Sequence, residues 1–496
     1  PGSMFGHTFL KANKSDRIDS PELLDYGINY SAYVGNANPI SYVIGGLFGG
    51  FDGYFAVLAY YFKVNEYNNA ESRDIWEYKL NFSEEETDFA LLHLWELGAV
   101  SFPYYFLTKN CSYQVLTLLE AAREDYHLSD QFAFHVIPVD TLRVLKKNNL
   151  IKGVKYRPSV FSKFMILYAK LNSKEKKLLR EIIAHEKKPD AIFSSINEER
   201  QPLLFDTAIA YLAYEKQYRL GNLEKEQRNL YLDLLRKRSK IKNVFPHNKN
   251  EKPEGVSDPL ESHKSPSFTF SAGYSSLGAY LGLTWRPALH DYLDLPKGYL
   301  RGSKVQVFDT EIRIFPKYTF IPQLWHWKLL DLMHLSPFHL ILKNFSWRTT
   351  LAFENRNIEY QASEFHNNQI YFYFQGGPGI SFPLWPSGPI RRFLFYTLLN
   401  LKTDFGGGLK KGYRLNINPE AGIISYLLDN FGVQLSSQYQ YSFLGDEFSF
   451  WKFFAGFSLF PSMNTAIRWE SAAFVNQESA IAIFNYESKI SFKVFF

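Results

Sequence analysis

The sequence predicts an α+β protein whose C-terminal part is an antiparallel transmembrane β-barrel of about 12 strands. Three observations predict this class. After residue 265 the apolar residues recur with a period of two, several of these segments run for about ten residues, and aromatic residues crowd their ends. Before residue 245, short β-rich segments alternate with amphipathic helical patterns instead.

Four regions follow from these changes of pattern. The chain of 496 residues is longer than one hydrophobic core usually supports, so we expect several domains. The polar, proline-rich segment 245–265 is predicted to be a linker. It separates a small domain over residues 1–155 and a helical region over 156–244 from the predicted barrel over 266–496.

Composition excludes several classes of function. The 55 basic and 50 acidic side chains are dispersed, net +5, and they form no block of the kind that binds nucleic acid. A single cysteine excludes an internal disulfide framework and a cysteine-based zinc site, and we predict neither a metal nor a cofactor. No apolar run is long enough for a transmembrane helix. The chain opens at Pro1-Gly2-Ser3-Met4 without a signal peptide, so we expect that an upstream segment was removed or left out, or that Pro-Gly-Ser is a cloning scar.

The first part of the small domain reads as strands. Residues 5–11 and 24–34 alternate and are rich in β-forming residues, and His7 lies on the first of these segments. Residues 43–53 contain five glycines and predict a flexible flap or a turn with close backbone approach. Residues 76–80 predict a further strand.

A helix over 84–98 is predicted next. Ser83 and Glu86 have the spacing of a capping box at its start. Its expected apolar face consists of Phe89, Leu92, Leu94 and Trp95.

Cys111 precedes apolar residues with helical spacing, which predicts a helix over about 110–123 with the sulfur at its N-terminus. The partial positive charge of a helix N-terminus lowers the pKa of a thiol, so we interpret Cys111 as a nucleophile. A buried structural cysteine is the alternative. A strand-like segment follows at 132–139. Residues 158–243 are helical in pattern, including 173–185 and 203–220 with a break at Gly221-Asn222, and they predict solvated helices or a spacer.

Strict alternation marks the C-terminal region along 345–354, 433–443 and 486–496. A soluble β-sandwich would give the same alternation. Strand length, the aromatic ends and the final Phe496, which resembles the C-terminal signal of bacterial outer-membrane barrels, favour the barrel.

A nucleophilic thiol needs a base within hydrogen-bond reach. Among the 12 histidines His7 is the best candidate, because it lies on a predicted strand of the same small domain. His93 and His127 lie on or beside helices, and His247 and His263 lie in or near the linker.

Six short blocks stand out within residues 3–143. They are Ser3-Met4-Phe5-Gly6-His7-Thr8-Phe9-Leu10, Leu24-Asp25-Tyr26-Gly27-Ile28-Asn29-Tyr30, Arg73-Asp74-Ile75-Trp76-Glu77-Tyr78, His93-Leu94-Trp95-Glu96-Leu97, Tyr104-Tyr105-Phe106-Leu107 and Asn110-Cys111-Ser112-Tyr113. These blocks resemble the signature of the periplasmic Lnb-type family, named for a bacterial lipoprotein N-acyltransferase. A histidine that precedes the cysteine also resembles the circularly permuted papain-like fold of lecithin:retinol acyltransferase relatives.

The resemblance implies a permuted papain-like domain in which Cys111 is the nucleophile and His7 the general base. Asn29 is our choice for the group that orients the base, with Tyr26, Tyr30 and Tyr105 as alternatives. Backbone N–H groups at the start of the cysteine helix, helped by Asn110 or Ser112, would stabilise an oxyanion. The named acyltransferase is associated with transmembrane helices, whereas this chain predicts a barrel, so the substrate does not transfer with the resemblance.

The resulting hypothesis is a thiol enzyme, an acyltransferase or a hydrolase, anchored in the outer membrane with its N-terminal domain in the periplasm. It would form a thioester on Cys111 and pass the acyl group to water or to an amine. Outer-membrane lipid is the expected partner, with lipoprotein, phospholipid or peptidoglycan as substrate and no nucleic acid. Two alternatives remain: a peptidoglycan amidase or endopeptidase, and a non-enzymatic pore, adhesin or assembly protein with a degenerate soluble domain. The oligomeric state stays open.

Overall fold

The computed structural model describes residues 6–14, 22–123, 125–132, 135–184, 196–218, 225–241, 251–355, 369–384, 393–406, 409–428, 430–476 and 483–496. It divides into two compact units, Pro1–Glu254 and Gly255–Phe496. Several predicted features lie outside the described residues, namely the opening Pro1-Gly2-Ser3-Met4, the start of the first predicted strand, the helix break at Gly221-Asn222 and residues 245–250 of the linker.

The first unit contains a four-stranded antiparallel sheet in the order β1-β2-β3-β5. Its strands are β1 (Leu10–Ala12), β2 (Tyr26–Ala32), β3 (Phe51–Ala59) and β5 (Phe102–Tyr104). A second sheet pairs β4 (Ile75–Leu80) with β6 (Ile151–Arg157). In the first sheet Leu10 pairs with Ile28, which brings the segment before β1 alongside the middle of β2.

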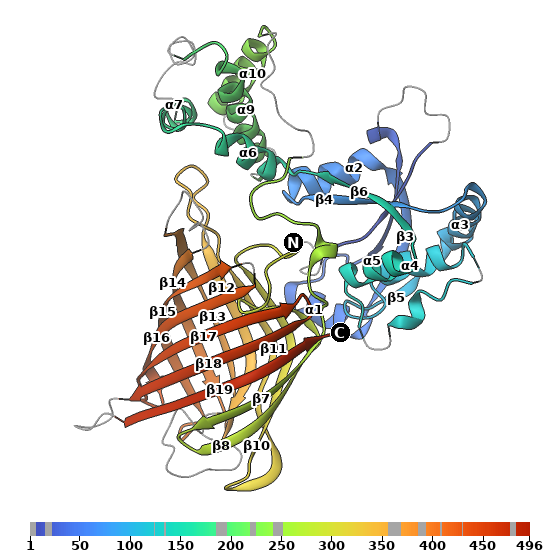
Figure 1. Ribbon diagram of the computed structural model, residues 1–496. Helices are drawn as coiled ribbons and strands as arrows, with labels where there is room; N and C mark the ends of the chain where they lie inside the picture. The colour runs from blue at the N-terminus through green and yellow to red at the C-terminus, as the bar shows by residue number, and fades with distance from the viewer. Residues whose placement is uncertain are drawn as a thin grey trace. The chain divides into compact units, whose positions relative to one another are not determined.

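Helices fill the space around these sheets (Figure 1). They are α1 (Pro39–Phe48), α2 (Tyr60–Val64), the π-helical turn η2 (Asn65–Ala70), α3 (Glu84–Glu96), α4 (Cys111–Glu120) and α5 (Pro138–Lys147), with 3-10 turns at η1 (Glu22–Leu24), η3 (Leu97–Ala99) and η4 (Ser129–Gln131). The predicted capping box is confirmed, because Ser83 Oγ accepts from Glu86 N and Glu86 Oε2 accepts from Ser83 N.

Helix α4 is the centre of the core of this unit. Its Leu118 packs on the sheet with Ile28, Tyr30 and Phe55. Its opposite side packs into a second buried cluster, which consists of Val115, Leu116, Leu119, Leu128, Val144, Leu145 and Leu150. Because apolar residues cover both sides of α4, its N-terminal residue Cys111 is held at a fixed depth, only 3% exposed.

Parts of three sequence predictions for this unit are wrong. The glycine-rich segment 43–53 is not a flap, since α1 covers its first half and β3 begins at Phe51. The alternative, a turn with close backbone approach, is confirmed, because Gly49 has φ +75° and the Gly50 N–H donates to the Gly45 carbonyl oxygen at 2.7 Å. Of the predicted apolar face of α3 only Leu94 packs on the core, since Phe89 is 56%, Leu92 67% and Trp95 87% exposed. Of the strand-like segment 132–139, the described part is not a strand, and α5 begins at Pro138 because proline suits the first turn of a helix.

The helical region consists of α6 (Val160–Ala169), α7 (Ser173–Ile183), α9 (Gln201–Tyr218) and α10 (Lys225–Arg238). Helix α9 buries Leu204, Phe205 and Ala208, so these helices share a small core of their own. Across the helices of the described part of the chain, none combines the length and the apolar character that a membrane-spanning helix requires.

The second unit is the predicted barrel. After the turn η5 (Pro259–Glu261) its strands are β7 (Ser267–Ser275), β8 (Gly278–Arg286), β9 (Ala288–His290), β10 (Ser303–Phe315), β11 (Thr319–His334), β12 (Ser346–Asn355), β13 (Ile370–Pro383), β14 (Phe393–Phe405), β15 (Tyr413–Leu428), β16 (Phe431–Gly445), β17 (Phe450–Ser462), β18 (Thr465–Asn476) and β19 (Ile483–Phe495). These described residues form a sheet of 13 strands, and β9 is a three-residue addition to β10, so 12 long strands remain.

The ring of strands is closed. The first and last long strands, β7 and β19, lie side by side and pair in an antiparallel register from Ser267 with Phe495 to Ser275 with Glu487 (Figure 1). Large apolar side chains such as Leu281, Leu401 and Ile490 point outward and are 58, 59 and 64% exposed. A closed antiparallel barrel with an apolar exterior satisfies every backbone group within a bilayer, which confirms the prediction of a transmembrane barrel over a soluble sandwich.

The barrel interior is polar and filled with ion pairs. Lys304 pairs with Asp331 at 2.6 Å, Arg348 with Glu420 at 2.9 Å and Arg414 with Asp404 at 2.6 Å. Other charged lumen residues include Arg313, paired with Glu311 and Glu487. The charges are therefore largely neutralised within the lumen, around a cavity of about 290 Å³.

Residues 288–302, which we call the inturned segment, fold into this lumen between β8 and β10. Asp291 pairs with Arg286 of β8 at 2.9 Å and with Arg468 of β18 at 3.0 Å. Asp294 pairs with Lys493 of β19 at 2.8 Å. The carbonyl oxygen of Tyr292 accepts from Tyr426 Oη of β15 at 2.9 Å. The inturned segment is thus fastened to strands on several sides of the barrel.

Candidate active site

His7 lies in the extended segment just before β1 and not on the strand itself, because β1 begins only at Leu10. Gly6 precedes it with φ +93°, a backbone conformation that side chains larger than hydrogen disfavour, so the Gly-His order has a conformational reason. The imidazole stacks on Tyr67 of η2 with ring centroids 5.5 Å apart. This contact and the neighbouring sheet hold the ring half-buried beside β2.

Cys111 is the first residue of α4, as the sequence predicts. Asn110 is the N-cap, and its Oδ1 accepts from the backbone N–H groups of Ser112 and Tyr113 at 3.1 and 3.2 Å. Such a cap fixes the helix start, and the helix dipole places partial positive charge near the sulfur.

The structure brings Cys111, His7 and Asn29 together, with His7 between the sulfur and Asn29. Asn29 Oδ1, on β2 and 4% exposed, lies 2.6 Å from His7 Nε2. A carbonyl oxygen can only accept, so Nε2 donates to it and Nδ1 is left for the sulfur. The His7 imidazole lies close enough to the Cys111 thiol for each group to shift the pKa of the other.

The electrostatics favour an ion pair between these two groups. Burial by itself lowers the pKa of His7, but the hydrogen bond to Cys111, the charge of its thiolate and the bond to Asn29 reverse this, so the pKa is raised. Burial raises the pKa of the Cys111 thiol. The hydrogen bond and charge of His7, the Thr8 N–H and the Tyr104 hydroxyl together lower this pKa by more than burial raises it, so the pKa is lowered overall. Opposite shifts on a thiol and an imidazole in contact are the condition for a reactive thiolate.

The three tyrosines proposed as alternatives to Asn29 have other environments or contacts. Tyr26 is 46% exposed. Tyr30 is fully buried and donates to the Phe102 carbonyl oxygen at 3.2 Å, and burial raises its pKa to about 12. The Tyr105 ring lies against Gly49, where an added Cβ would be 2.4 Å from it. Of the four candidates, Asn29 is therefore the residue that the structure places on His7.

The side chains of Asn110 and Ser112 stabilise the start of α4 through hydrogen bonds. The Asn110 amide donates to the carbonyl oxygens of Phe106 and Val136 at 3.1 and 2.8 Å, and Ser112 Oγ donates to Asn110 Oδ1 at 2.7 Å. Their N–H and O–H groups are thus already used, and the structure does not offer these side chains as donors to an oxyanion.

Two donors at the sulfur were missed by the sequence reasoning. Tyr104 Oη accepts from the Cys111 N–H at 3.2 Å, and the Tyr104 hydroxyl and the Thr8 N–H both lower the pKa of the Cys111 thiol. The Tyr30 ring stacks on Tyr104 at 5.8 Å and fixes its orientation. Strand alternation could have identified Tyr104, because it shares a face of β5 with Phe102 while Pro103 points outward.

Tyr104→Phe is expected to slow any acyl transfer at Cys111 by about 10²-fold, the cost typical of losing one oxyanion donor. Burial and the Cys111 charge raise the pKa of Tyr104, so its hydroxyl stays protonated and can donate. Acylation removes the charge from the sulfur and frees this hydroxyl for the oxyanion. Steady-state kinetics would show a lower kcat with little change in KM. Tyr105→Phe serves as the matched control, and equal losses in both variants would contradict the assignment.

A bell-shaped pH dependence is expected for the same reaction. The thiolate–imidazolium form exists above the lowered pKa of Cys111 and below the raised pKa of His7. Asn29→Ala removes one interaction that raises the pKa of His7, while Lys63, which lowers it, remains. The alkaline limb of kcat/KM should therefore move to lower pH, with a rate loss of about 10-fold to 10²-fold from the misoriented base. An unmoved alkaline limb would contradict the role of Asn29.

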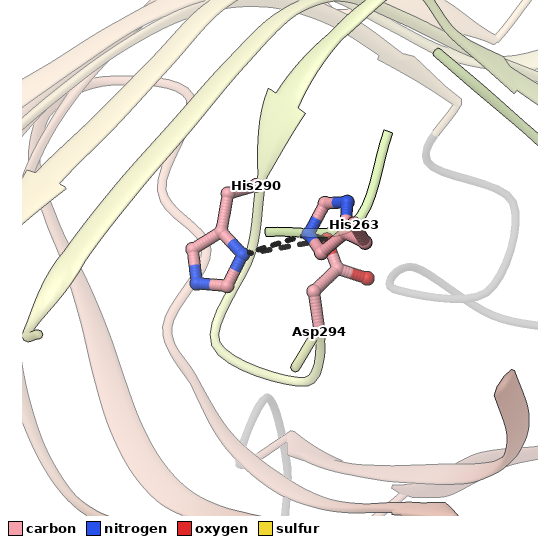
Figure 2. Close-up of side chains that lie close together, drawn as sticks. All are labelled: His263, His290 and Asp294. Carbon is pink, nitrogen blue, oxygen red and sulfur yellow. Dashed lines mark hydrogen bonds and ion pairs between the residues drawn. The ribbon is translucent and has the colours of Figure 1, made fainter. Parts of the chain in front are cut away.

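The second unit contains one cluster, among the described residues, with the donor set of a metal site (Figure 2). His263 Nε2 lies 3.1 Å from His290 Nδ1, and the Asp294 carboxylate lies about 4 Å from both rings. His263 Nδ1 donates to the Lys264 carbonyl oxygen at 2.6 Å, so its Nε2 accepts from His290. The Asp294 carboxylate also forms ion pairs with Arg286, Arg468 and Lys493. With three cations on one carboxylate, this cluster is better explained as part of the inturned segment's ion network than as a cation site.

The closed barrel and the Cys–His–Asn line define the class of protein: an outer-membrane β-barrel protein with a separate N-terminal domain that carries a thiol–imidazole cluster. Comparison with family models identifies that domain. Residues 1–148 match the Lnb N-terminal periplasmic domain, so the chain carries a periplasmic domain of Lnb type. Residues 154–249 and 256–483 match two domains of unknown function, DUF7842 and DUF7840. The resemblance predicted from the sequence blocks is confirmed, while the permuted papain-like fold stays a prediction.

Solved structures similar to this chain include porins and an outer-membrane protein. The NanC porin has 8% identity and a TM-score of 0.30, covering 46% of this chain and 99% of its own. The KdgM porin in complex with disordered oligogalacturonate has 9% identity and a TM-score of 0.28, with the same coverage. OmpT of Vibrio cholerae has 7% identity and a TM-score of 0.22, covering 47% of this chain and 96% of its own. No curated protein matches the chain.

Proposed function

We propose that this protein is a thiol enzyme, anchored in the outer membrane, that acts on acyl or amide bonds through a thioester on Cys111. The observation that carries the proposal is the line from Asn29 through His7 to the Cys111 sulfur at the start of α4. A nucleophile, a base in contact with it and a group that orients the base are the parts that acyl transfer requires.

The chemistry follows from these contacts. The Cys111 thiolate attacks the acyl carbon, and the oxyanion takes hydrogen bonds from the Cys111 N–H and the Tyr104 hydroxyl. The carbon–heteroatom bond breaks as protonated His7 gives its proton to the leaving group, which leaves a thioester on Cys111. His7 then accepts a proton from water or an amine as that acceptor attacks, and the thiolate is regenerated. Water as acceptor makes the protein a hydrolase and an amine makes it a transferase.

The barrel serves as the anchor in this proposal. Its lumen is crossed by ion pairs and by the inturned segment, which supports an anchoring role in preference to an open pore. The non-enzymatic alternative would be favoured by a base far from the thiol, and the contact between His7 and Cys111 gives it no such support.

The test is a panel of acyl donors offered to the full-length protein in a bilayer. Diacyl phospholipid, a diacylated lipopeptide and purified peptidoglycan are each incubated with the wild type and with Cys111→Ala, and products are identified by mass spectrometry. The proposal expects Cys111-dependent loss of an acyl group from one lipid donor. Cuts confined to peptidoglycan peptides would favour the amidase alternative, and no Cys111-dependent product from any donor would contradict the proposal.

A further inference from the structure

Helix α1 packs against its own domain through glycines, which is the reverse of an ordinary surface helix. A Cβ added at Gly45 would lie 2.7 Å from the Phe51 ring, and one added at Gly46 would lie 2.2 Å from the Phe106 ring. No larger side chain fits on this inner side without displacing those rings. Surface helices normally turn their apolar stripe inward and their polar face outward. In α1 the apolar side chains must therefore lie elsewhere.

These side chains are on the outer face of α1, which we define as Val43, Ile44, Leu47 and Phe48. Three of them are strongly exposed: Val43 by 51%, Ile44 by 53% and Phe48 by 78%. Their spacing places all four on one stripe of the helix. From Val34 to Phe51 the sequence contains no charged residue, so no charged side chain of this segment borders the stripe.

The helix that carries the outer face is connected to Cys111 through two aromatic residues. The Tyr42 ring, one residue before Val43, lies 5.0 Å from the Phe106 ring. Phe106 packs edge-on against Tyr104 at 6.1 Å, and Tyr104 Oη receives the N–H of Cys111. A surface that binds the outer face of α1 would thus meet the protein beside the candidate active site.

We propose that the outer face of α1 is a lipid-docking surface that seats the N-terminal domain on the membrane. The occupant is a bilayer because the chain itself supplies one: the barrel begins at Ser267, shortly after the boundary of the first unit at Glu254. Such a tether gives the bilayer a high effective concentration at the domain. An uncharged aliphatic stripe that ends in an aromatic residue suits the headgroup–acyl boundary, whereas protein interfaces surround their apolar centre with a polar rim.

Docking at this surface does not depend on enzymatic activity. The consequence that the acyl donor is a bilayer lipid rests on the proposed function. The two statements therefore need separate measurements, one of depth in the membrane and one of turnover.

The depth measurement needs a single labelled cysteine, which is possible because Cys111 is the one cysteine of the chain and can be replaced. In a Cys111→Ser background, Ile44→Cys is spin-labelled in the full-length protein in nanodiscs of phosphatidylethanolamine and phosphatidylglycerol. The label should be reached by oxygen and shielded from an aqueous nickel complex, while a label introduced by Leu232→Cys on α10, at a side chain 39% exposed, should show the opposite. Access of the nickel complex to position 44 would overturn the proposal. Shielding from both reagents would assign the face to a protein contact and would overturn it too.

The turnover measurement uses the charged double variant Ile44→Asp with Phe48→Asp. Because both side chains point away from the domain, the fold should be retained. Turnover of a bilayer phospholipid is expected to fall by at least about 10-fold, as an acidic face is expelled from the interface. Hydrolysis of a water-soluble short-chain ester should stay within about twofold of wild type. Equal rates on both substrates in variant and wild type would overturn the link between docking and donor. If the wild type turns over neither substrate, the proposed function fails and the depth measurement still decides on docking.

Discussion

Cys111→Ala and His7→Ala are each expected to abolish acyl turnover, with losses of about 10⁴-fold or more for the nucleophile and about 10²-fold to 10⁴-fold for the base. The two groups interact directly, and each shifts the pKa of the other in the direction that catalysis needs. Because they act as one unit, the double variant should be scarcely worse than Cys111→Ala alone. Initial rates on the responsive acyl donor measure this.

Controls for this prediction come from the same domain. His93→Ala removes a histidine of α3 that lies 3.2 Å from Glu96 at the surface, and it should leave the rate unchanged. Cys111→Ser keeps the volume of the buried side chain and separates loss of the thiol from loss of packing. Activity retained by either alanine variant, with circular dichroism unchanged, would contradict the assignment of nucleophile and base.

Asp294→Ala is expected to lower the free energy of unfolding of the barrel by about 3–5 kcal/mol, the cost of breaking a buried ion pair from one side. Asp294 is fully buried, and its removal leaves Arg286, Arg468 and Lys493 with Asp291 as their remaining acidic partner in the inturned segment. Urea unfolding in lipid vesicles, followed by tryptophan fluorescence, gives this quantity. Asp294→Asn, which keeps the shape, should also destabilise because it removes the charge.

The same network predicts how the barrel conducts. In planar bilayers the wild type should pass little current, and Asp291→Ala with Asp294→Ala should raise the conductance by releasing the inturned segment. Glu261→Ala is the matched control, because Glu261 pairs with Lys297 at the surface and such pairs contribute about 0–1 kcal/mol. A wild-type conductance as large as that of the double variant would show that the inturned segment does not close the lumen.

The sequence carried enough information to predict the barrel and the group of Cys111, His7 and Asn29. Alternation along 345–354 needs only a period of two, and β12 reproduces it with Ser346, Thr350 and Ala352 inward and Trp347 outward. Cys111 was proposed because it is the single cysteine and precedes a predicted helix, and the family resemblance paired it with His7. Asn29 was our choice among four polar residues, and its contact with His7 follows from the pairing of β1 with β2, which brings the segment before β1 alongside Asn29.

Other features depend on contacts between distant segments, which local patterns do not encode. Gly45 and Gly46 suggest a flexible turn until Phe51 and Phe106 are seen to occupy the space beside them, and a helix then becomes the better packed solution. Tyr104 acts on the sulfur only because β5 ends beside the start of α4. The cations around Asp294 come from β8 and from β18 and β19, which follow much later in the sequence.

The central claim is that Cys111 carries the acyl group as a thioester. The most direct test mixes the protein in a bilayer with the responsive acyl donor, quenches with acid within the first turnover, and determines the mass of the peptide that contains Cys111. The account predicts that this peptide gains the mass of the acyl group, loses it with hydroxylamine, and shows neither change in His7→Ala. An unmodified Cys111 peptide, together with donor turnover that persists in Cys111→Ala, would contradict it.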